Sequence, residues 1–186
     1  MTIYKRVWQM PNLNTFNGHI HQWIDIQIRS QQTFLKKHYG LKIPREDMVI
    51  LEPFARNSKI ANHTNDINPD TDAQDHMPAD EWLQWKFDEG VRADIILYDP
   101  PYSPRQITEC YSAAGIKATQ QDTQSSFYTK FKKLIPPLVK KGGLVLSFGW
   151  NSSGMGKYFG HYEEILLVGH GGAHNDTICV SQRKNM

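Results

Sequence analysis

The chain is poor in cysteine, in net charge and in long hydrophobic runs. Its only cysteines are Cys110 and Cys179, which cannot make a disulfide framework and are not spaced for a metal site, so we expect free thiols. Basic residues number 21 and acidic residues 19, a net charge of +2 that argues against coating nucleic acid through a broad positive field. This charge still allows a grip on a short stretch of nucleic acid.

Two further absences concern membranes and secretion. No apolar stretch approaches the roughly 20 residues that cross a bilayer, so we expect no membrane partner. The segment Met1–Trp8 has no secretory hydrophobic region, which predicts a cytoplasmic protein. With 186 residues and 39% hydrophobic content, the chain is long enough for one domain with a proper core and too short for two ordinary domains.

Short apolar runs alternate with amphipathic stretches from residue 17 onward, which is typical of a parallel sheet flanked by helices. We therefore expect an α/β fold. In the first half of the chain the pattern predicts a helix over Gly18–His38, a strand over Met48–Leu51, a short strand over Asn65–Ile67, a helix over Asp80–Asp88 and a strand over Ile95–Asp99.

The last third of the chain predicts one helix followed by three strands. The connection Gly171–Asn175 is too short for a crossover, so the two final strands must form an antiparallel hairpin. A mostly parallel sheet thus ends in an antiparallel strand. The predicted elements are a helix over Phe127–Lys140, interrupted near its end by Pro136 and Pro137, and strands over Leu144–Phe148, Glu164–Gly169 and Asp176–Ser181.

The tetrapeptide Asp99-Pro100-Pro101-Tyr102 directly follows the apolar run Ala93–Tyr98. Two consecutive prolines must end a strand, so the carboxylate and the aromatic ring lie at its carboxyl end, where open α/β sheets bind ligands. The prolines also hold the backbone rigid. A carboxylate acceptor, fixed carbonyl groups and an aromatic face suit a planar amine.

Three familiar site patterns do not fit the chain. The segment Gly149–Gly154 is followed by Met155 where a phosphate-binding P-loop needs lysine. The residues after the first predicted strand contain no glycine, so the G-x-G-x-x-G pyrophosphate cradle is absent there. His170 and His174 lie four apart between two strands rather than on a helix, which favours a structural or substrate-facing role over a metal site, and we expect no metal.

Five sequence blocks at strand ends carry a resemblance to a known family. They are Glu52–Ser58, Thr64–Pro69, Asp99–Gln106, Phe148–Gly156 and Gly169–Thr177. From about Val49 to Lys184 the chain resembles the small adenine-specific DNA methyltransferases of phages and mobile elements, in the permuted order that places the cofactor blocks first. The resemblance implies a Rossmann-like methyltransferase fold with a mostly parallel seven-stranded sheet, a C-terminal antiparallel strand and helices on both faces.

The same resemblance implies the domain plan and the cofactor. Residues 1–186 would form one catalytic domain, with an N-terminal helical segment over 1–46 and no separate target-recognition domain. The cofactor would be S-adenosylmethionine, with the first block around its methionine moiety and Asp66 on its ribose hydroxyls, as in dinucleotide-binding folds. The implied cofactor-binding residues are Glu52, Pro53, Phe54, Ala55, Arg56, Asn57, Ser58, Asp66, Ile67, Asn68, Asp75, His76 and Met77.

The resemblance further implies that Asp99, Pro100, Pro101 and Tyr102 form the catalytic block and hold the amine of adenine. The lone pair of this amine is delocalised into the ring, so the site must localise it by accepting its two hydrogens on the Asp99 carboxylate and the Pro100 carbonyl. Tyr102 would stack on the base, which must be flipped out of a DNA duplex.

The residues implied to contact DNA follow two strand ends. Arg105 is the phosphate candidate, because it follows the catalytic block where a helix can begin. Sequence preference would come from loops, from a partner in a homodimer, or be low. The implied substrate-binding residues are Ser103, Arg105, Gln106, Trp150, Asn151, Met155 and Lys157.

Two departures and two alternatives accompany this interpretation. The loop Phe54–Ser58 lacks the glycines that let a backbone approach a cofactor. Pro78 follows the region where the family often has an acidic residue at the cofactor adenine, and Asp75 or Asp80 would be its replacement. The methyl acceptor could instead be cytosine, a guanine in RNA or a glutamine amide in protein. The other alternative is a protein that binds S-adenosylmethionine or nucleic acid without turnover.

Overall fold

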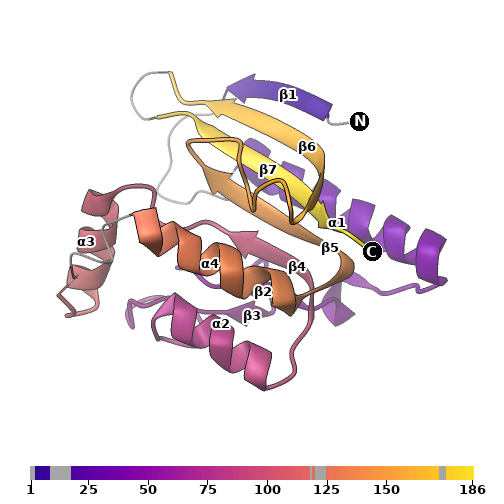
Figure 1. The fold of residues 1–186 in the computed structure, drawn as a ribbon. Coiled ribbons are helices and arrows are strands. Elements are labelled where there is room, and N and C mark those ends of the chain that lie inside the picture. Colours follow the sequence, from indigo (N-terminus) through magenta and orange to yellow (C-terminus); the bar gives the residue numbers. More distant parts are fainter. Residues whose placement is uncertain (1–2, 9–17, 118, 120–124, 172–174) are drawn as a thin grey trace.

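The computed structural model describes residues 3–8, 18–117, 119, 125–171 and 175–186. Their centre is a seven-stranded sheet of order β1-β6-β7-β5-β4-β2-β3 (Figure 1). The elements are β1 (Ile3–Trp8), α1 (Gly18–Tyr39), the 3-10 helix η1 (Arg45–Asp47), β2 (Ile50–Glu52), β3 (His63–Thr64), α2 (Ala79–Asp88), β4 (Ala93–Tyr98), α3 (Pro104–Ala113), α4 (Ser125–Leu138), β5 (Val139–Gly149), β6 (Gly160–Gly169) and β7 (Thr177–Lys184).

The strand pairing confirms the expected Rossmann-like α/β architecture. Strand β4 pairs in parallel with β2 and β5, β2 pairs in parallel with β3, and β1 pairs in parallel with β6. Strand β7 is antiparallel to both of its neighbours, β5 and β6. The predicted closing hairpin is therefore present, although residues 172–174 of its connection lie outside the described part of the chain.

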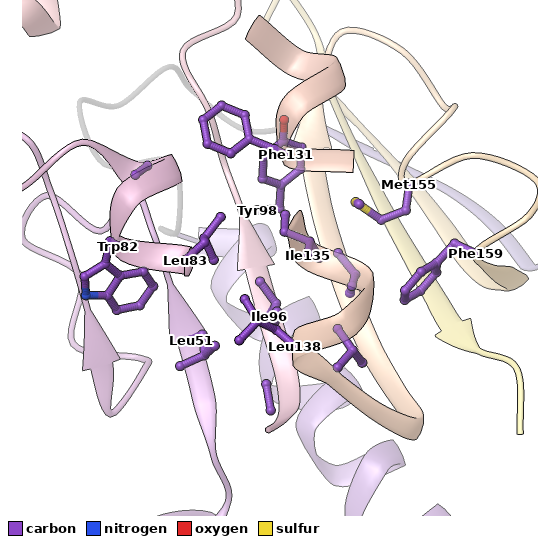
Figure 2. Packing of buried hydrophobic residues seen from close by; sticks show 14 of the residues in the cluster. Leu51, Trp82, Leu83, Ile96, Tyr98, Phe131, Ile135, Leu138, Met155 and Phe159 are labelled. Atoms are coloured by element: carbon purple, nitrogen blue, oxygen red, sulfur yellow. The ribbon is translucent and has the colours of Figure 1, made fainter. Parts of the chain in front are cut away.

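Helices cover both faces of the sheet, and this burial on two sides explains why the sequence of β4 is a continuous apolar run. Ile95 and Leu97 pack with α1 on one face, whereas Ile96 and Tyr98 pack with α2 and α4 on the other. Figure 2 shows this second face, where Phe131 of α4 lies beside Tyr98. A strand buried on both faces gains from apolar residues at every position rather than at alternate ones.

Helix α1 buries an apolar face against the sheet, and two glutamines on that face are buried as well. Gln27 donates to the carboxylate of Glu164 over 3.0 Å, and Gln31 donates to the carbonyl of Gly142 over 3.2 Å. The amide oxygen of Gln31 also accepts a hydrogen bond from Arg183. These side chains are buried without losing their hydrogen bonds, so they fix the helix on the sheet at little desolvation cost.

The structure differs from the predicted elements at three places. Strand β1 lies inside residues 1–46, which were expected to form a helical segment, β3 precedes the expected strand at residues 65–67, and β5 begins at Val139, inside the expected helix. Helix α4 ends before Val139 because Pro136 and Pro137 supply no backbone N–H for another turn. Lys184 from β7 donates to the carbonyls of Pro136 over 2.7 Å and of Val139 over 2.8 Å, which satisfies part of that helix end.

No helix within the described ranges is both long and apolar enough to span a membrane. The single catalytic domain over residues 1–186 stays a prediction.

Candidate functional site

A candidate site is a cavity of about 570 Å³ at the carboxyl ends of β2 and β4. This is the edge where parallel α/β sheets bind ligands. Its walls come from the loop after β2, the loop after β3, the Asp99–Tyr102 block and helices α2, α3 and α4. They comprise Pro53, Phe54, Arg56, Asp66, Ile67, Asn68, Thr71, Ala79, Asp80, Asp99, Pro100, Pro101, Tyr102, Gln106, Glu109, Cys110, Tyr111, Ala113, Phe127 and Phe131.

The loop after β2 is tied to the loop after β3 by hydrogen bonds. The backbone N–H of Ala55 donates to the carbonyl of Asn65 over 2.8 Å, and that of Arg56 donates to the Asp66 carboxylate over 3.0 Å. Arg56 has a φ of 49°, a left-handed conformation that glycine adopts more easily. The loop thus makes its turn without the glycine that the sequence lacks.

Glu52 ends β2 beneath this loop and is only 1% exposed. Its carboxylate accepts a hydrogen bond from the Ser58 hydroxyl over 2.8 Å, while its Oε1 atom has no hydrogen-bond partner among the described residues. Burial raises the pKa of Glu52 to about 8, and the negative charge of Asp99 contributes to the rise. Glu52 and Ser58 therefore support the cavity from below rather than line it.

Asp66 lines the cavity and also organises the loops around it. Its two carboxylate oxygens accept the backbone N–H groups of Arg56, over 3.0 Å, and Asn68, over 2.9 Å. A carboxylate has about four acceptor positions, so two remain for a ligand. Ile67 and Asn68, two further predicted cofactor residues, line the cavity beside it.

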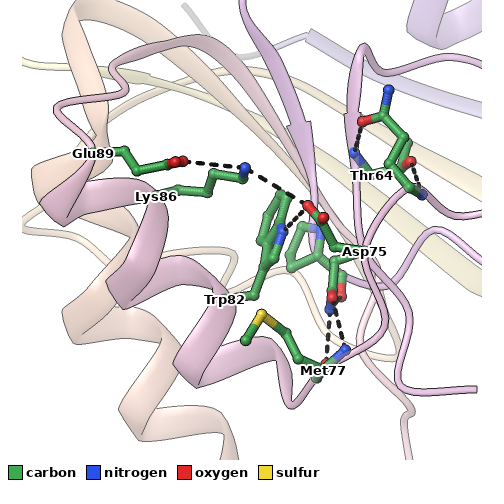
Figure 3. Close-up of polar contacts among 9 residues, drawn as sticks. Thr64, Asp75, Met77, Trp82, Lys86 and Glu89 are labelled. Carbon is green, nitrogen blue, oxygen red and sulfur yellow. Dashed lines mark hydrogen bonds and ion pairs between the residues drawn. The ribbon is translucent and has the colours of Figure 1, made fainter.

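Asp75, His76 and Met77 do not line the cavity, contrary to expectation. Figure 3 shows the carboxylate of Asp75 turned toward helix α2, where it accepts the Trp82 indole N–H over 2.7 Å and lies 3.6 Å from the Lys86 ammonium. The backbone of Met77 is held at both its N–H and its carbonyl by the side chain of Asn65. These residues fix the start of α2.

Two further predicted residues, Ala55 and Asn57, hold the site together rather than line it, as His76 does. Ala55 is buried, and the Asn57 side chain accepts the backbone N–H of Asp72 over 2.9 Å. His76 lies 3.3 Å from the carbonyl of Asp66. Asp80, the second residue considered for the cofactor adenine, does line the cavity and pairs with Lys130 over 3.0 Å.

The Asp99–Tyr102 block is fixed from both sides. The Tyr102 hydroxyl donates to the Asp99 carboxylate, and the Tyr128 hydroxyl of α4 donates to the Pro101 carbonyl over 2.8 Å. The backbone N–H of Tyr102 donates to the Gln106 side chain over 2.7 Å. The predicted helix start is confirmed, because Ser103 caps α3 by accepting the Gln106 backbone N–H over 3.2 Å.

A smaller cavity of about 200 Å³ shares Pro100 and Tyr102 with the larger one. The ring of Tyr102 faces that of Trp150 with centroids 5.7 Å apart. The smaller cavity is lined by Tyr98, Pro100, Tyr102, Tyr128, Lys132, Ser147, Phe148, Gly149, Trp150, Asn151, Ser153 and Gly154. The Asp99–Tyr102 block thus lies between two cavities.

The loop that closes the smaller cavity is held by two hydrogen bonds to Gln182 of β7. Its side chain accepts the Met155 backbone N–H over 2.7 Å and donates to the Gly156 carbonyl over 3.2 Å. A Cβ atom on Gly154 would lie 2.2 Å from the amide oxygen of the same side chain, and the positive φ of 49° at this residue also favours glycine. Met155 itself is buried in the core, which corrects its expected role as a substrate contact.

Trp150 and Asn151 line the smaller cavity and Gln106 lines the larger one, whereas the predicted DNA contacts Ser103, Arg105 and Lys157 lie outside both cavities. Arg105 is exposed and pairs with Glu109 over 2.7 Å, and Lys157 lies over the ring of Tyr158 at 4.8 Å. Sequence reasoning missed Tyr128 and Lys132 of α4. Their spacing of four residues on one helix face, one turn before the two prolines, was the available signal.

Among the described residues, no group of three or more His, Cys, Asp and Glu side chains is arranged to hold a metal ion. His174 lies outside the described residues.

Comparisons with known proteins find structural similarities only. No family model matches the chain, and no curated protein matches its sequence. A hypothetical protein from Thermus thermophilus aligns over 95% of this chain and 92% of its own, with 12% identity and a TM-score of 0.46. Two further structures belong to longer proteins, and this chain spans about a third of the length of each. One is a candidate methyltransferase complexed with SAH (61% of this chain, 33% of that one, 15% identity, TM-score 0.42), and the other is a candidate SAM-dependent methyltransferase from Streptococcus mutans (60% and 32%, 15%, 0.37).

Proposed function

We propose that this chain is an S-adenosylmethionine-dependent methyltransferase that modifies the exocyclic amine of adenine in DNA. The observation that carries the proposal is the Asp99–Tyr102 wall between two cavities of unequal size. A transfer reaction needs a donor site and an acceptor site that meet at the reacting atoms. Pro100 and Tyr102 belong to both cavities, and Asp99 faces the larger one.

The larger cavity fits the cofactor by size and by chemistry. Its volume of about 570 Å³ lies within the range of about 300–1,000 Å³ that is usual for cofactors and drug-sized ligands. Asp66 retains acceptor positions for two ribose hydroxyls, while Phe54 and Ile67 give apolar walls for a flat ring. When bound, S-adenosylmethionine supplies a methyl group on a positively charged sulfur.

Asp99 and Pro100 would act on the acceptor amine. Asp99 accepts one amine hydrogen and the Pro100 carbonyl accepts the other, which draws the nitrogen lone pair out of the ring and toward the methyl group. Tyr102 and Trp150 give the acceptor side aromatic surface on which a flat base can stack. Such a transfer depends on orientation, which alone can contribute roughly 7–11 kcal/mol to lowering the barrier.

Arg105 would meet DNA phosphate outside the cavities. Its partner Glu109 is more than half exposed, so the ion pair is weak and phosphate can replace the carboxylate.

The test is methyl transfer from S-adenosylmethionine carrying a deuterated methyl group to DNA and, separately, to RNA, followed by mass spectrometry of the nucleosides. We expect deuterated N6-methyladenine in DNA and none with the Asp99→Ala variant. The deuterium label excludes methyl groups that the nucleic acid already carried. Labelled methylcytosine, or labelled methylguanine in RNA, would replace the adenine proposal with another planar nitrogen. Cofactor binding without any labelled product would replace it with a binding protein.

A further inference from the structure

Two hydroxyl groups at the floor of the smaller cavity have no hydrogen-bond partner among the described residues. They belong to Tyr98 of β4 and Ser147 of β5, which face each other directly in the parallel register. Both residues line the cavity, yet they are only 5% and 7% exposed. The sheet register therefore places the two residues side by side on the same face, and each carries a buried, unpaired hydroxyl.

Such a pair is costly to a folded protein. A buried hydroxyl that gives up water without gaining another partner destabilises the native state, so nearly all buried polar groups are paired. Replacement by phenylalanine or alanine would remove this cost without leaving a large void. Tyr98 and Ser147 thus retain polar atoms that the core does not need.

The other walls of this cavity define what fits above the hydroxyls. Tyr102 and Trp150 supply aromatic faces, and Lys132 adds positive charge while donating to Ser153 over 3.4 Å. The volume of about 200 Å³ is below the usual range for whole drug-sized ligands, so it suits one ring system. A flat, neutral heterocycle attached to a phosphate matches these features better than a flexible glutamine side chain does.

We propose that the hydroxyls of Tyr98 and Ser147 bind the ring-nitrogen edge of the acceptor base, beside the amine that Asp99 and Pro100 hold. This inference rests on the proposed function and names the residues that select a nucleobase at its acceptor site. Each hydroxyl can donate a hydrogen bond to a ring nitrogen. Burial raises the pKa of Tyr98 far above its ordinary value, so the phenol stays protonated and able to donate.

The variants are Tyr98→Phe and Ser147→Ala, with Ser181→Ala as the matched control. Ser181 also carries a buried hydroxyl without a described partner, on β7, but it lines neither cavity. Tyr39→Phe is the control for the loss of a phenol far from the site. All four variants are expected to fold, and Tyr98→Phe and Ser147→Ala should melt at or above the wild-type temperature. A melting temperature lowered by several degrees in these two would show that the hydroxyls serve the core, and would overturn the proposal.

Two functional measurements test whether the two hydroxyls bind the acceptor base. The first is kcat/KM for methyl transfer to a DNA oligonucleotide, which we expect to fall about tenfold with Tyr98→Phe or Ser147→Ala and to stay unchanged in the controls. Oligonucleotides with 1-deazaadenine or 7-deazaadenine lack one ring nitrogen each. With the wild type, one of these analogues should be methylated more slowly than adenine. With the Tyr98→Phe and Ser147→Ala variants, the same analogue and adenine should be methylated at equal rates. Variants that match the wild type on adenine would overturn the proposal.

The second readout is equilibrium binding of a single-stranded oligonucleotide with one adenine, in the presence of SAH. Weaker binding by Tyr98→Phe and Ser147→Ala, with no methyl transfer even by the wild type, would refute the proposed function and keep the base-edge site. Normal transfer and binding by both variants would refute the site and keep the function. A wild type that neither binds nor methylates any oligonucleotide would refute both.

Discussion

The hydroxyl of Tyr102 donates a hydrogen bond to the carboxylate of Asp99, three residues earlier in the chain. Both side chains reach the larger cavity, and Tyr102 also reaches the smaller one. The contact holds the carboxylate in one orientation. Tyr102 therefore has two separable tasks in the proposed reaction, which are to orient Asp99 and to stack on the acceptor base.

Substitutions at Tyr102 can separate these tasks. Tyr102→Phe removes the hydroxyl and keeps the ring, so we expect kcat to fall no more than about tenfold, the cost of one hydrogen bond. Tyr102→Ala also removes the stack, which contributes roughly 1–3 kcal/mol per base, so KM for DNA should rise further, by up to about 100-fold. Steady-state kinetics with varied DNA measures both. Equal losses in the two variants would refute the stacking task.

Asp99→Ala should abolish methyl transfer while leaving S-adenosylmethionine affinity within several-fold of wild type. The reason is that Asp99 is proposed to orient the amine, whereas Asp66 and the loop after β2 are proposed to bind the cofactor in the larger cavity. Calorimetric titration with the cofactor, alongside the labelled-methyl assay, measures the two effects. If binding disappeared together with activity, Asp99 would belong to the cofactor site and the mechanism would need replacement.

The sequence predicted the strand ends well because apolar runs and prolines are local signals. Residues 93–98 and the block that follows lie where the pattern places them, and so does the cap at Ser103. Strand β1 was not predicted because its polar residues Lys5 and Arg6 hide the pattern, and its pairing with β6 joins segments about 160 residues apart.

Side-chain direction was harder to predict than position. Asp75 looked like a cofactor residue, yet its carboxylate meets Trp82 seven residues later, in α2. Met155 was predicted to contact the substrate, yet its backbone N–H donates to the Gln182 side chain and its own side chain packs in the core. Both outcomes depend on partners from other elements, which a local pattern does not encode.

Asp66→Ala should show the reverse of Asp99→Ala, with loss of cofactor affinity dominating. The carboxylate would no longer hold the backbone N–H groups of Arg56 and Asn68, and hydrogen bonds to charged groups contribute about 1.5–3 kcal/mol each. We expect weaker S-adenosylmethionine binding by at least tenfold and a lower melting temperature. Asp72→Ala is the control, because Asp72 is exposed and pairs only weakly with Lys59 on the same loops. Equal effects of the two variants would contradict the role of Asp66.

Glu52 should make stability fall as pH rises. Below pH 4.5 both the native and unfolded states hold its proton. Between pH 4.5 and about 8 the unfolded state loses the proton while the native state keeps it, so the free energy of unfolding decreases by up to about 1.4 kcal/mol per pH unit. Glu52→Gln keeps an acceptor for Ser58 and removes this titration.

Melting curves across pH 4 to 9 test the Glu52 prediction. The Gln variant should be more stable than wild type at pH 8 and should lose the slope, whereas the exposed-residue control Glu46→Gln should keep it. A wild-type slope that persisted in Glu52→Gln would assign the pH dependence to other groups.

Arg56 combines a left-handed backbone with a side chain in the cavity wall, so glycine and alanine should affect it differently. Arg56→Gly removes the steric penalty of that conformation, about 1 kcal/mol, and should raise stability relative to Arg56→Ala, which keeps the penalty. Both variants lose the guanidinium and should weaken cofactor binding to the same extent. Thermal melts and cofactor titration of the pair therefore separate backbone strain from side-chain binding. An alanine variant more stable than the glycine variant would show that the loop leaves this conformation in solution.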